Sequence, residues 1–362
     1  SKSYYQGLIS TDKLLLRPES FYTKNKVTLL LGHRVESIDR VAKKVALDNQ
    51  QTVEYEHLIL ATGTRARTLK IEGADRPEIH YLRSKDDVNK IKARSKPGAK
   101  LLIVGAGYIG LEIAASAIKM GMQVTVLEAM DRVLARVTSP EVSKFYQRIH
   151  TEEGVNFRFN TTLTKIIETD GSLSALLSND EKINFDFAIV GIGVIPNSEL
   201  AETAGLNCDN GILVNEFTQT VDPSIYAIGD CSNHHSLFYN KYLRLESVPN
   251  AVEQAKIAAS NICGMKVVYD SLPWFWSDQY DVKLQTAGLS EGYDEIVLRG
   301  DPTTRKFSVF YLNNKQLIAV DAINSPAEFM LSKKLIVNHS HPNPNDLADT
   351  DLPMKSLLDI NS

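Results

Sequence analysis

The sequence predicts an α/β protein whose parallel sheets present their binding sites at the ends of strands. Three stretches predict it, each an apolar strand that runs into a turn containing glycine: residues 57–63, 100–112 and 225–230. Uninterrupted apolar residues are typical of strands buried on both faces of a parallel sheet. Because open sheets of this kind bind ligands at the carboxyl ends of their strands, these turns are the first places to look for a site.

The stretch at 100–112 has the most specific pattern. After the strand at 100–104, Gly105 allows a sharp turn, Gly107 removes a side chain so that a pyrophosphate can approach the backbone, and Gly110 lets a helix pack on the strand. Apolar residues at helical spacing predict a helix over 108–120, with Gly121 at its C′ position. The start of such a helix favours anions. The motif therefore predicts a dinucleotide, in preference to a glycine turn in a nucleotide-free domain.

A second strand is predicted at 123–128 and ends on Glu128, 18 residues after Gly110. A carboxylate at this position accepts hydrogen bonds from the hydroxyls of an adenine ribose and repels a 2′-phosphate. The pattern therefore favours NADH over NADPH. Arg132 and Arg136 follow closely enough in sequence to leave this choice open.

Composition sets the outer limits. The chain has 362 residues, 43% of them hydrophobic, and a net charge of −4, which is ordinary for two or three globular domains and carries no nucleic-acid signature. No apolar run reaches the roughly 18 residues that span a bilayer, so no membrane partner is expected. Three scattered cysteines without CxxC spacing indicate a reducing, cytoplasmic setting and no metal site built on thiolates.

The other elements follow in chain order. A short helix is expected after Pro18, and the segments 27–31, 34–38, 44–47 and 51–55 predict a small antiparallel sheet with one face in solvent. A helix is expected from about 84 to 94. Strands at 156–159, 163–167, 173–177 and 186–190 are expected to continue the sheet of the nucleotide-binding unit.

Three further strand ends are candidate binding positions. The turns at 61–63 and 191–197 are rich in small residues and can bring backbone close to a ligand, although plain structural turns are nearly as good an interpretation. Asp230, at the end of an apolar strand, can accept from a ribityl or ribose hydroxyl. Its alternative role is an N-cap for the helix expected near Pro249, or a loop carboxylate.

These motifs, together with residues 15–18, 243–247 and 273–279, resemble the flavin-dependent ferredoxin and rubredoxin reductases of the bacterial oxygenase-linked type, within the pyridine nucleotide-disulfide oxidoreductase superfamily. The resemblance covers essentially all 362 residues, and the run at 273–279 is its most specific part. It implies two Rossmann-like dinucleotide-binding domains and a C-terminal α+β interface domain. The implied boundaries are 1–95 with 207–268 for the FAD domain, 96–206 for the NADH domain, and 269–362 for the third.

The resemblance implies that electrons pass from NADH through FAD to a small iron–sulfur ferredoxin or a rubredoxin that feeds an oxygenase, in a monomer or weak homodimer. A disulfide reductase, or a flavoprotein similar to apoptosis-inducing factor, is the alternative; the paired cysteines of the former would precede Ser1. The family's first phosphate-binding segment would also precede Ser1. We therefore expect an FAD domain incomplete at its N-terminus, with a weakened hold on the flavin.

Site residues are implied by the same resemblance. Lys2 resembles the lysine beside the N5 region of the flavin, Glu112 the carboxylate near the nicotinamide carboxamide, and Trp276 an aromatic residue beside the flavin ring. These are the three catalytic candidates, and no metal ligands are predicted. The cofactor-binding candidates are Arg17, Ala61, Thr62, Gly63, Arg67, Gly105, Gly107, Tyr108, Ile109, Gly110, Glu112, Glu128, Arg136, Gly191, Ile192, Gly193, Gly229, Asp230, Ser247, Val248 and Trp276.

Overall fold

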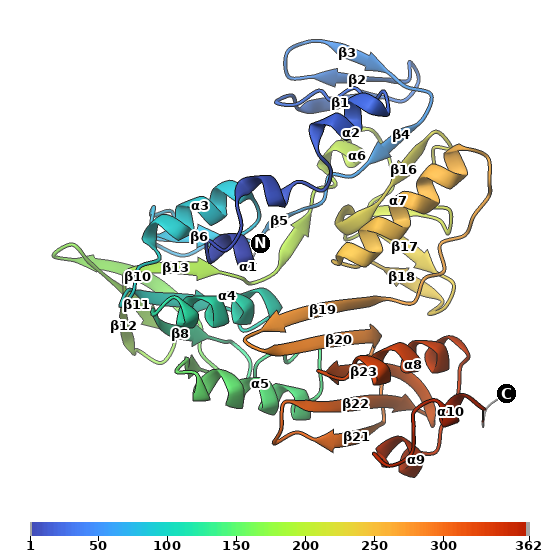
Figure 1. Ribbon diagram of the computed structural model, residues 1–362. Helices are drawn as coiled ribbons and strands as arrows, with labels where there is room; N and C mark the ends of the chain where they lie inside the picture. Colours follow the sequence, from blue (N-terminus) through green and yellow to red (C-terminus); the bar gives the residue numbers. More distant parts are fainter. Residues whose placement is uncertain (1, 360–362) are drawn as a thin grey trace. The chain divides into compact units, whose positions relative to one another are not determined.

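The computed structural model describes residues 2–359, which form two compact units. Within the described residues, unit 1 comprises 2–9, 66–193 and 274–359, and unit 2 comprises Ser10–Arg65 and Val194–Pro273. Both mix helices with parallel and antiparallel strands, which confirms the predicted α/β class (Figure 1). The finer three-domain division stays a prediction.

Unit 1 is built on a five-stranded parallel sheet. Its strand order is β6 (Ile79–Tyr81), β13 (Phe187–Val190), β7 (Lys100–Val104), β8 (Gln123–Leu127) and β9 (Asn156–Arg158). The central strand β7 is buried from Leu101 onward because it has neighbours on both sides and is covered on both faces. Its carboxyl end is therefore held rigidly where the glycine turn begins.

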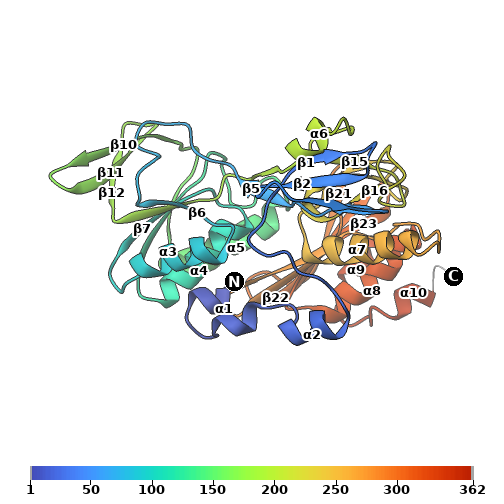
Figure 2. The same ribbon diagram turned by 90° about the horizontal axis from the view of Figure 1, so that it is seen from above.

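Three helices belong to this sheet, and two of them start at a side-chain cap. α3 (Lys85–Arg94) begins with a capping box between Ser84 and Asp87, and α5 (Pro140–Glu152) begins at Ser139, whose hydroxyl accepts from Val142 N. α4 (Tyr108–Lys119) begins at the glycine turn and is followed by Gly121 at φ +79°. Figures 1 and 2 show α3 and α4 next to the parallel strands.

The strands expected at 163–167 and 173–177 exist, but they do not continue the parallel sheet. β10 (Leu163–Thr169), β11 (Ser172–Leu177) and β12 (Lys182–Phe185) form a separate antiparallel sheet. The reason is the turn between the first two: Asp170 and Gly171 have φ of 50° and 75°, the geometry of a tight hairpin that sends the chain straight back. The apolar side of this small sheet packs on the face of the parallel sheet formed by Leu102, Val104 and Val190.

The C-terminal part of unit 1 is a five-stranded antiparallel sheet with helices, as the expected α+β class requires. Its order is β19 (Trp274–Gln279), β20 (Val282–Gly288), β23 (Gln316–Ile323), β22 (Lys306–Asn313) and β21 (Glu295–Asp301). The helices α8 (Pro326–Val337), α9 (Pro344–Ala348) and α10 (Ser356–Asp359) follow it. The aromatic run at 273–279 is therefore mostly the edge strand β19, which contacts α4.

Unit 2 contains several small sheets around one apolar core. β4 (Leu58–Leu60) pairs in parallel with β16 (Ile225–Ala227), and their carboxyl ends lie side by side. The other strands are β1 (Val35–Asp39), β2 (Lys44–Leu47) and β3 (Thr52–Glu54) in one antiparallel sheet, and β15 (Ile212–Val214), β17 (Ser232–Ser236) and β18 (Lys241–Leu243) in another. Its main helix is α7 (Val248–Ile262), and its core joins residues of β1, β2, β4, β15 and β16.

The remaining elements are short. They are α1 (Lys2–Tyr5), the 3₁₀ turns η1 (Thr11–Leu14) and η2 (Gly229–Cys231), α2 (Glu19–Lys24), α6 (Glu199–Thr203), β5 (Thr64–Ala66) and β14 (Val194–Pro196). The strand expected at 27–31 is wrong: all five residues are exposed and make no sheet pairing, because β propensity needs a partner strand to act on. Among residues 2–359 no helix is long and apolar enough to cross a membrane.

Candidate functional site

Two of the three motif glycines are required by close packing of backbone against backbone. A Cβ on Gly105, whose φ is +105°, would lie 2.4 Å from the carbonyl oxygen of Gly191, and a Cβ on Gly110 would lie 2.1 Å from the carbonyl oxygen of Gly105. The Gly191 amide in turn donates to Val104 O at 2.8 Å. The ends of β7 and β13 and the start of α4 are therefore locked together, and this brings Gly191, the first residue of the turn predicted at 191–197, to the glycine motif.

Gly107 differs from its two neighbours. Its φ of −77° suits any residue, and no described atom lies within 4 Å of the place where its Cβ would sit. It precedes the first turn of α4, whose leading N–H groups have no partner within the helix. An open backbone in front of unpaired donors fits a pyrophosphate, since the phosphates could reach these N–H groups only if no side chain stood there.

Glu128 is held beside this turn. Its Oε2 accepts from the amide of Ala106 at 2.8 Å and its Oε1 from the amide of Met130 at 2.9 Å. Arg132 is turned away into its own loop, where its guanidinium donates to the carbonyl of Ala135 at 2.9 Å, while Arg136 is exposed. The charge next to the glycine turn is therefore negative, which favours a ribose with a free 2′-hydroxyl.

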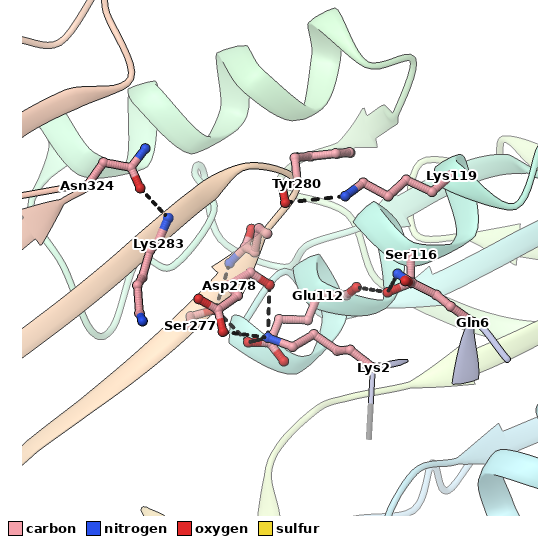
Figure 3. A network of polar contacts seen from close by, with 11 residues as sticks. Lys2, Gln6, Glu112, Ser116, Lys119, Ser277, Asp278, Tyr280, Lys283 and Asn324 are labelled. Carbon is pink, nitrogen blue, oxygen red and sulfur yellow. Dashed lines mark hydrogen bonds and ion pairs between the residues drawn. The ribbon is translucent and has the colours of Figure 1, made fainter. Parts of the chain in front are cut away.

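Lys2 and Glu112, two of the catalytic candidates, contact each other. Lys2 Nζ donates to Glu112 Oε1 and to the carbonyl oxygen of Asp278, both at 2.9 Å, and Ser277 Oγ donates to the same Glu112 oxygen at 2.7 Å (Figure 3). α1, α4 and β19 thus meet at one half-buried ion pair. The sequence could not predict this contact, because its members are 110 and 165 positions apart.

The residues that flank this ion pair in the sequence differ in exposure. The Tyr108 hydroxyl is buried without a hydrogen-bond partner among the described residues, and its ring packs edge-on against Phe275 with centroids 4.7 Å apart. Tyr108 can therefore offer a ligand its backbone amide but not its side chain. Ile109 is 50% exposed at the turn. Trp276, the third catalytic candidate, is 40% exposed and lies beside Trp274.

In unit 2, Asp230 follows β16 and accepts a hydrogen bond from Thr64 Oγ1 at 3.3 Å. Its alternative role as an N-cap is wrong, because Ser247 caps α7: Ser247 Oγ accepts from Asn250 N at 3.3 Å. The preceding Gly229 has φ +71°, and its amide donates to the buried side chain of Gln254 at 2.7 Å. A carboxylate fixed at a strand end fits a partner with hydroxyl groups, such as the ribityl chain of a flavin.

The other cofactor-binding candidates lie mostly at the surface. Thr62 exchanges two hydrogen bonds with Asn197, at 2.7 and 2.8 Å, so its turn is rigid. Val248 is 63% exposed at the first turn of α7. The rest are exposed or partly exposed: Arg17, Ala61, Gly63, Arg67, Ile192 and Gly193. No group of three metal-ligating side chains occurs within the described part of the chain.

Sequence reasoning missed a buried acid, Asp321 of β23. It accepts from Tyr311 Oη and Thr286 Oγ1, both at 2.6 Å, and from Thr138 Oγ1, which stands in front of α5. Burial raises the pKa of the Asp321 carboxyl in spite of these three donors. One signal was present, a single acid within the apolar run 316–323. The cluster ties the loop behind Glu128 to the C-terminal sheet.

Comparisons with known proteins agree with this architecture. The model of a family described as pyridine nucleotide-disulphide oxidoreductase matches residues 6–255, and a model described as reductase C-terminal matches residues 274–358. Putidaredoxin reductase CamA from Pseudomonas putida is 43% identical, over 99% of this chain and 86% of that protein. Rhodocoxin reductase from Rhodococcus erythropolis is 41% identical, over 98% and 83% of the two chains.

Solved structures give the same picture. The crystal structure of a covalent putidaredoxin reductase–putidaredoxin complex matches with a TM-score of 0.95 and 42% identity, over 99% of this chain and 88% of that one. The ferredoxin reductase for the CYP199A2 system from Rhodopseudomonas palustris matches with a TM-score of 0.94 and 36% identity, over 98% and 88%.

Proposed function

The chain belongs to the pyridine nucleotide-disulphide oxidoreductase family, and from that premise we propose that it is an NADH-dependent reductase that passes electrons through FAD to a small iron–sulfur ferredoxin or a rubredoxin. The observation that carries the proposal is the likeness along nearly the whole chain to a reductase solved in covalent complex with putidaredoxin. A rubredoxin-NAD(+) reductase from Pseudomonas putida, 40% identical over 90% of this chain, keeps rubredoxin among the acceptors.

The residues of the chain have distinct tasks in this reaction. The glycine turn would hold the NADH pyrophosphate in front of Gly107, and Glu128 would accept from its adenine ribose. In unit 2, Asp230 and the first turn of α7 are the candidates to hold the flavin. The ion pair of Lys2 and Glu112 would orient the reacting rings, and the aromatic side chains around it would exclude water.

When bound, NADH supplies a hydride and FAD accepts it and releases the two electrons one at a time. The protein then needs to bind, align and shield, and no side-chain nucleophile is required. This agrees with the structure. The described cysteines are free, and burial raises the pKa of the Cys208 thiol to about 11, which makes it a poor thiolate. No observation in the described chain favours disulfide reduction over electron transfer.

The oxygenase that such a ferredoxin would feed and a cytoplasmic location belong to the same proposal. Its test is an acceptor panel. The flavin-loaded protein is mixed with NADH and with a [2Fe–2S] ferredoxin, a rubredoxin, or a low-molecular-weight disulfide, and the reduction of each acceptor is followed by its absorbance. We expect rapid reduction of at least one of the two iron proteins and none of the disulfide. Reduction of the disulfide alone would refute the proposal.

A further inference from the structure

A line of buried polar side chains leads away from Glu112. Ser277 Oγ lies 2.7 Å from Glu112 Oε1, and Gln279 Nε2 lies 3.1 Å from Ser277 Oγ. Gln279 Oε1 is 2.7 Å from His150 Nε2, and His150 Nδ1 is 3.1 Å from the hydroxyl of Tyr280. Ser277, Gln279 and His150 are each at most 1% exposed, so water does not replace these partners.

The hydrogen bonds of this line all run in one direction. A carboxylate only accepts, so Ser277 spends its single proton on Glu112 and must accept from the amide nitrogen of Gln279. The carbonyl oxygen of Gln279 then faces His150, which places the imidazole proton on Nε2 and leaves Nδ1 to accept from Tyr280. Burial lowers the pKa of His150 to about 4, so at neutral pH the ring has one proton and one tautomer.

We propose that Gln279 and His150 are positioning residues that fix the Ser277 hydroxyl on Glu112, and thereby hold the ion pair with Lys2 in one geometry for hydride transfer from NADH. The inference rests on the proposed function, because it takes Lys2 and Glu112 to lie at the redox site. Without Gln279, the hydrogen bond to Glu112 alone would orient the Ser277 hydroxyl. With it, only one rotamer satisfies both neighbours.

The surroundings of Glu112 explain why such a donor matters. Its charged and titratable neighbours are Lys2 from α1, Asp278 from β19 and Tyr146 from α5. Lys2 Nζ lies between Glu112 and Asp278, 3.9 Å from Asp278 Oδ2, and could move from one carboxylate to the other. The Ser277 hydroxyl contacts only Glu112 of the two, so a fixed hydroxyl holds Glu112 in place while Lys2 is shared.

The first test is spectroscopic. Nitrogen-15 NMR of histidine-labelled flavoprotein at pH 7 should show His150 as the neutral tautomer with its proton on Nε2. Replacing Gln279→Leu should move the ring shifts of His150, because the acceptor of its Nε2 proton is removed while Tyr280 stays on Nδ1. The matched control is Gln316→Leu, which removes a similar contact, Gln316 Nε2 to His339 Nδ1 at 2.8 Å, from the surface. It should move the His339 resonance and leave His150 unchanged.

The second test separates positioning from binding. In stopped-flow reduction by NADH, Gln279→Leu should slow the limiting rate of flavin reduction about tenfold and change the NADH dissociation constant less than about twofold. His150→Phe, which keeps an aromatic ring but removes its nitrogens, should slow the limiting rate of flavin reduction about threefold. Ser277→Ala should resemble Gln279→Leu, whereas Ser277→Thr keeps the hydroxyl and should recover most of the rate. Gln316→Leu should behave as wild type.

Two results would overturn the inference: a His150 tautomer with its proton on Nδ1, or wild-type flavin reduction in Gln279→Leu. If Gln279→Leu fails to fold, the wild-type tautomer and the comparison of Ser277→Ala with Ser277→Thr decide the matter. Neither the NMR measurement nor the reduction of the flavin by NADH involves the protein acceptor. A protein that NADH reduces but that passes no electrons to an iron protein would therefore sink the proposed function and leave this inference standing.

Discussion

Gly107 and Gly110 stand three residues apart in one turn, yet their replacement by alanine should have opposite consequences. At Gly107 the φ is −77° and the space in front is open, so Gly107→Ala fits the protein without strain. Its stability should change by less than about 1 kcal/mol. The new methyl group would occupy the place of the pyrophosphate. We expect the dissociation constant for NADH to rise at least about tenfold, which is about 1.4 kcal/mol.

At Gly110 the added Cβ would lie 2.1 Å from the carbonyl oxygen of Gly105, so α4 must move away from β7 by roughly 1 Å. Gly110→Ala should therefore lower the free energy of unfolding by about 1–3 kcal/mol. Calorimetric titration with NADH and thermal melts of both variants, beside wild type, check the two effects. Wild-type NADH binding by Gly107→Ala would show that the pyrophosphate does not cross this turn. A Gly110→Ala variant as stable as wild type would contradict the packing.

Three other predictions concern charge. Glu128→Gln combined with Ala129→Arg should raise the preference for NADPH in kcat/KM, and a wild-type protein that uses both nucleotides equally well would contradict the role of Glu128. Burial lowers the pKa of His150 to about 4 in the folded protein, against about 6.5 in the unfolded chain, so the unfolded chain binds a proton first as the pH falls. The contribution of the neutral ring to the free energy of unfolding is therefore complete above about pH 6.5 and is lost as the pH falls toward about 4. Thermal melts should show that the free energy of unfolding is about 2 kcal/mol lower at about pH 5 than at about pH 7, and that this difference is smaller in His150→Phe. Lys334 is exposed on α8, so Lys334→Glu should slow the reduction of an acidic ferredoxin several-fold at low salt only. The reduction of ferricyanide should stay unchanged. An equal loss of rate in both assays would mean that Lys334 supports the fold and not the docking of the acceptor.

Local patterns predicted the nucleotide-binding elements well. The helix over 108–120, its C′ glycine and the strands on either side were all readable, because strand, turn and helix follow one another and each has its own periodicity. Pairing partners were harder. Alternating apolar residues at 163–177 predicted strands but not their sheet, although Asp170-Gly171 is a recognisable hairpin turn. The segment 27–31, which contains Val27 and three leucines, shows that apolar residues alone do not make a strand.

The candidate site, too, contains residues that the sequence could predict and residues that it could not. The glycine turn and the place of Glu128 beside it could be predicted from spacing, since both depend on neighbours in the sequence. Lys2 and Glu112 were selected by resemblance alone. Their direct contact, and the hydrogen bond of Ser277 to the same carboxylate, depend on the packing of three separate segments. Asp321 had one local signal, a single acid within an apolar run, and the line from Glu112 to His150 had none. Their meaning comes from burial and hydrogen-bond direction, which only coordinates supply.

One measurement tests the central claim most directly. The flavoprotein is reduced with one equivalent of NADH in the absence of oxygen and is then mixed in a stopped-flow instrument with an excess of oxidised [2Fe–2S] ferredoxin or rubredoxin. We predict that NADH bleaches the flavin absorbance, and that its return coincides with the reduction of two equivalents of one of these one-electron acceptors per flavin. A flavin that NADH reduces but neither iron protein reoxidises would contradict the claim.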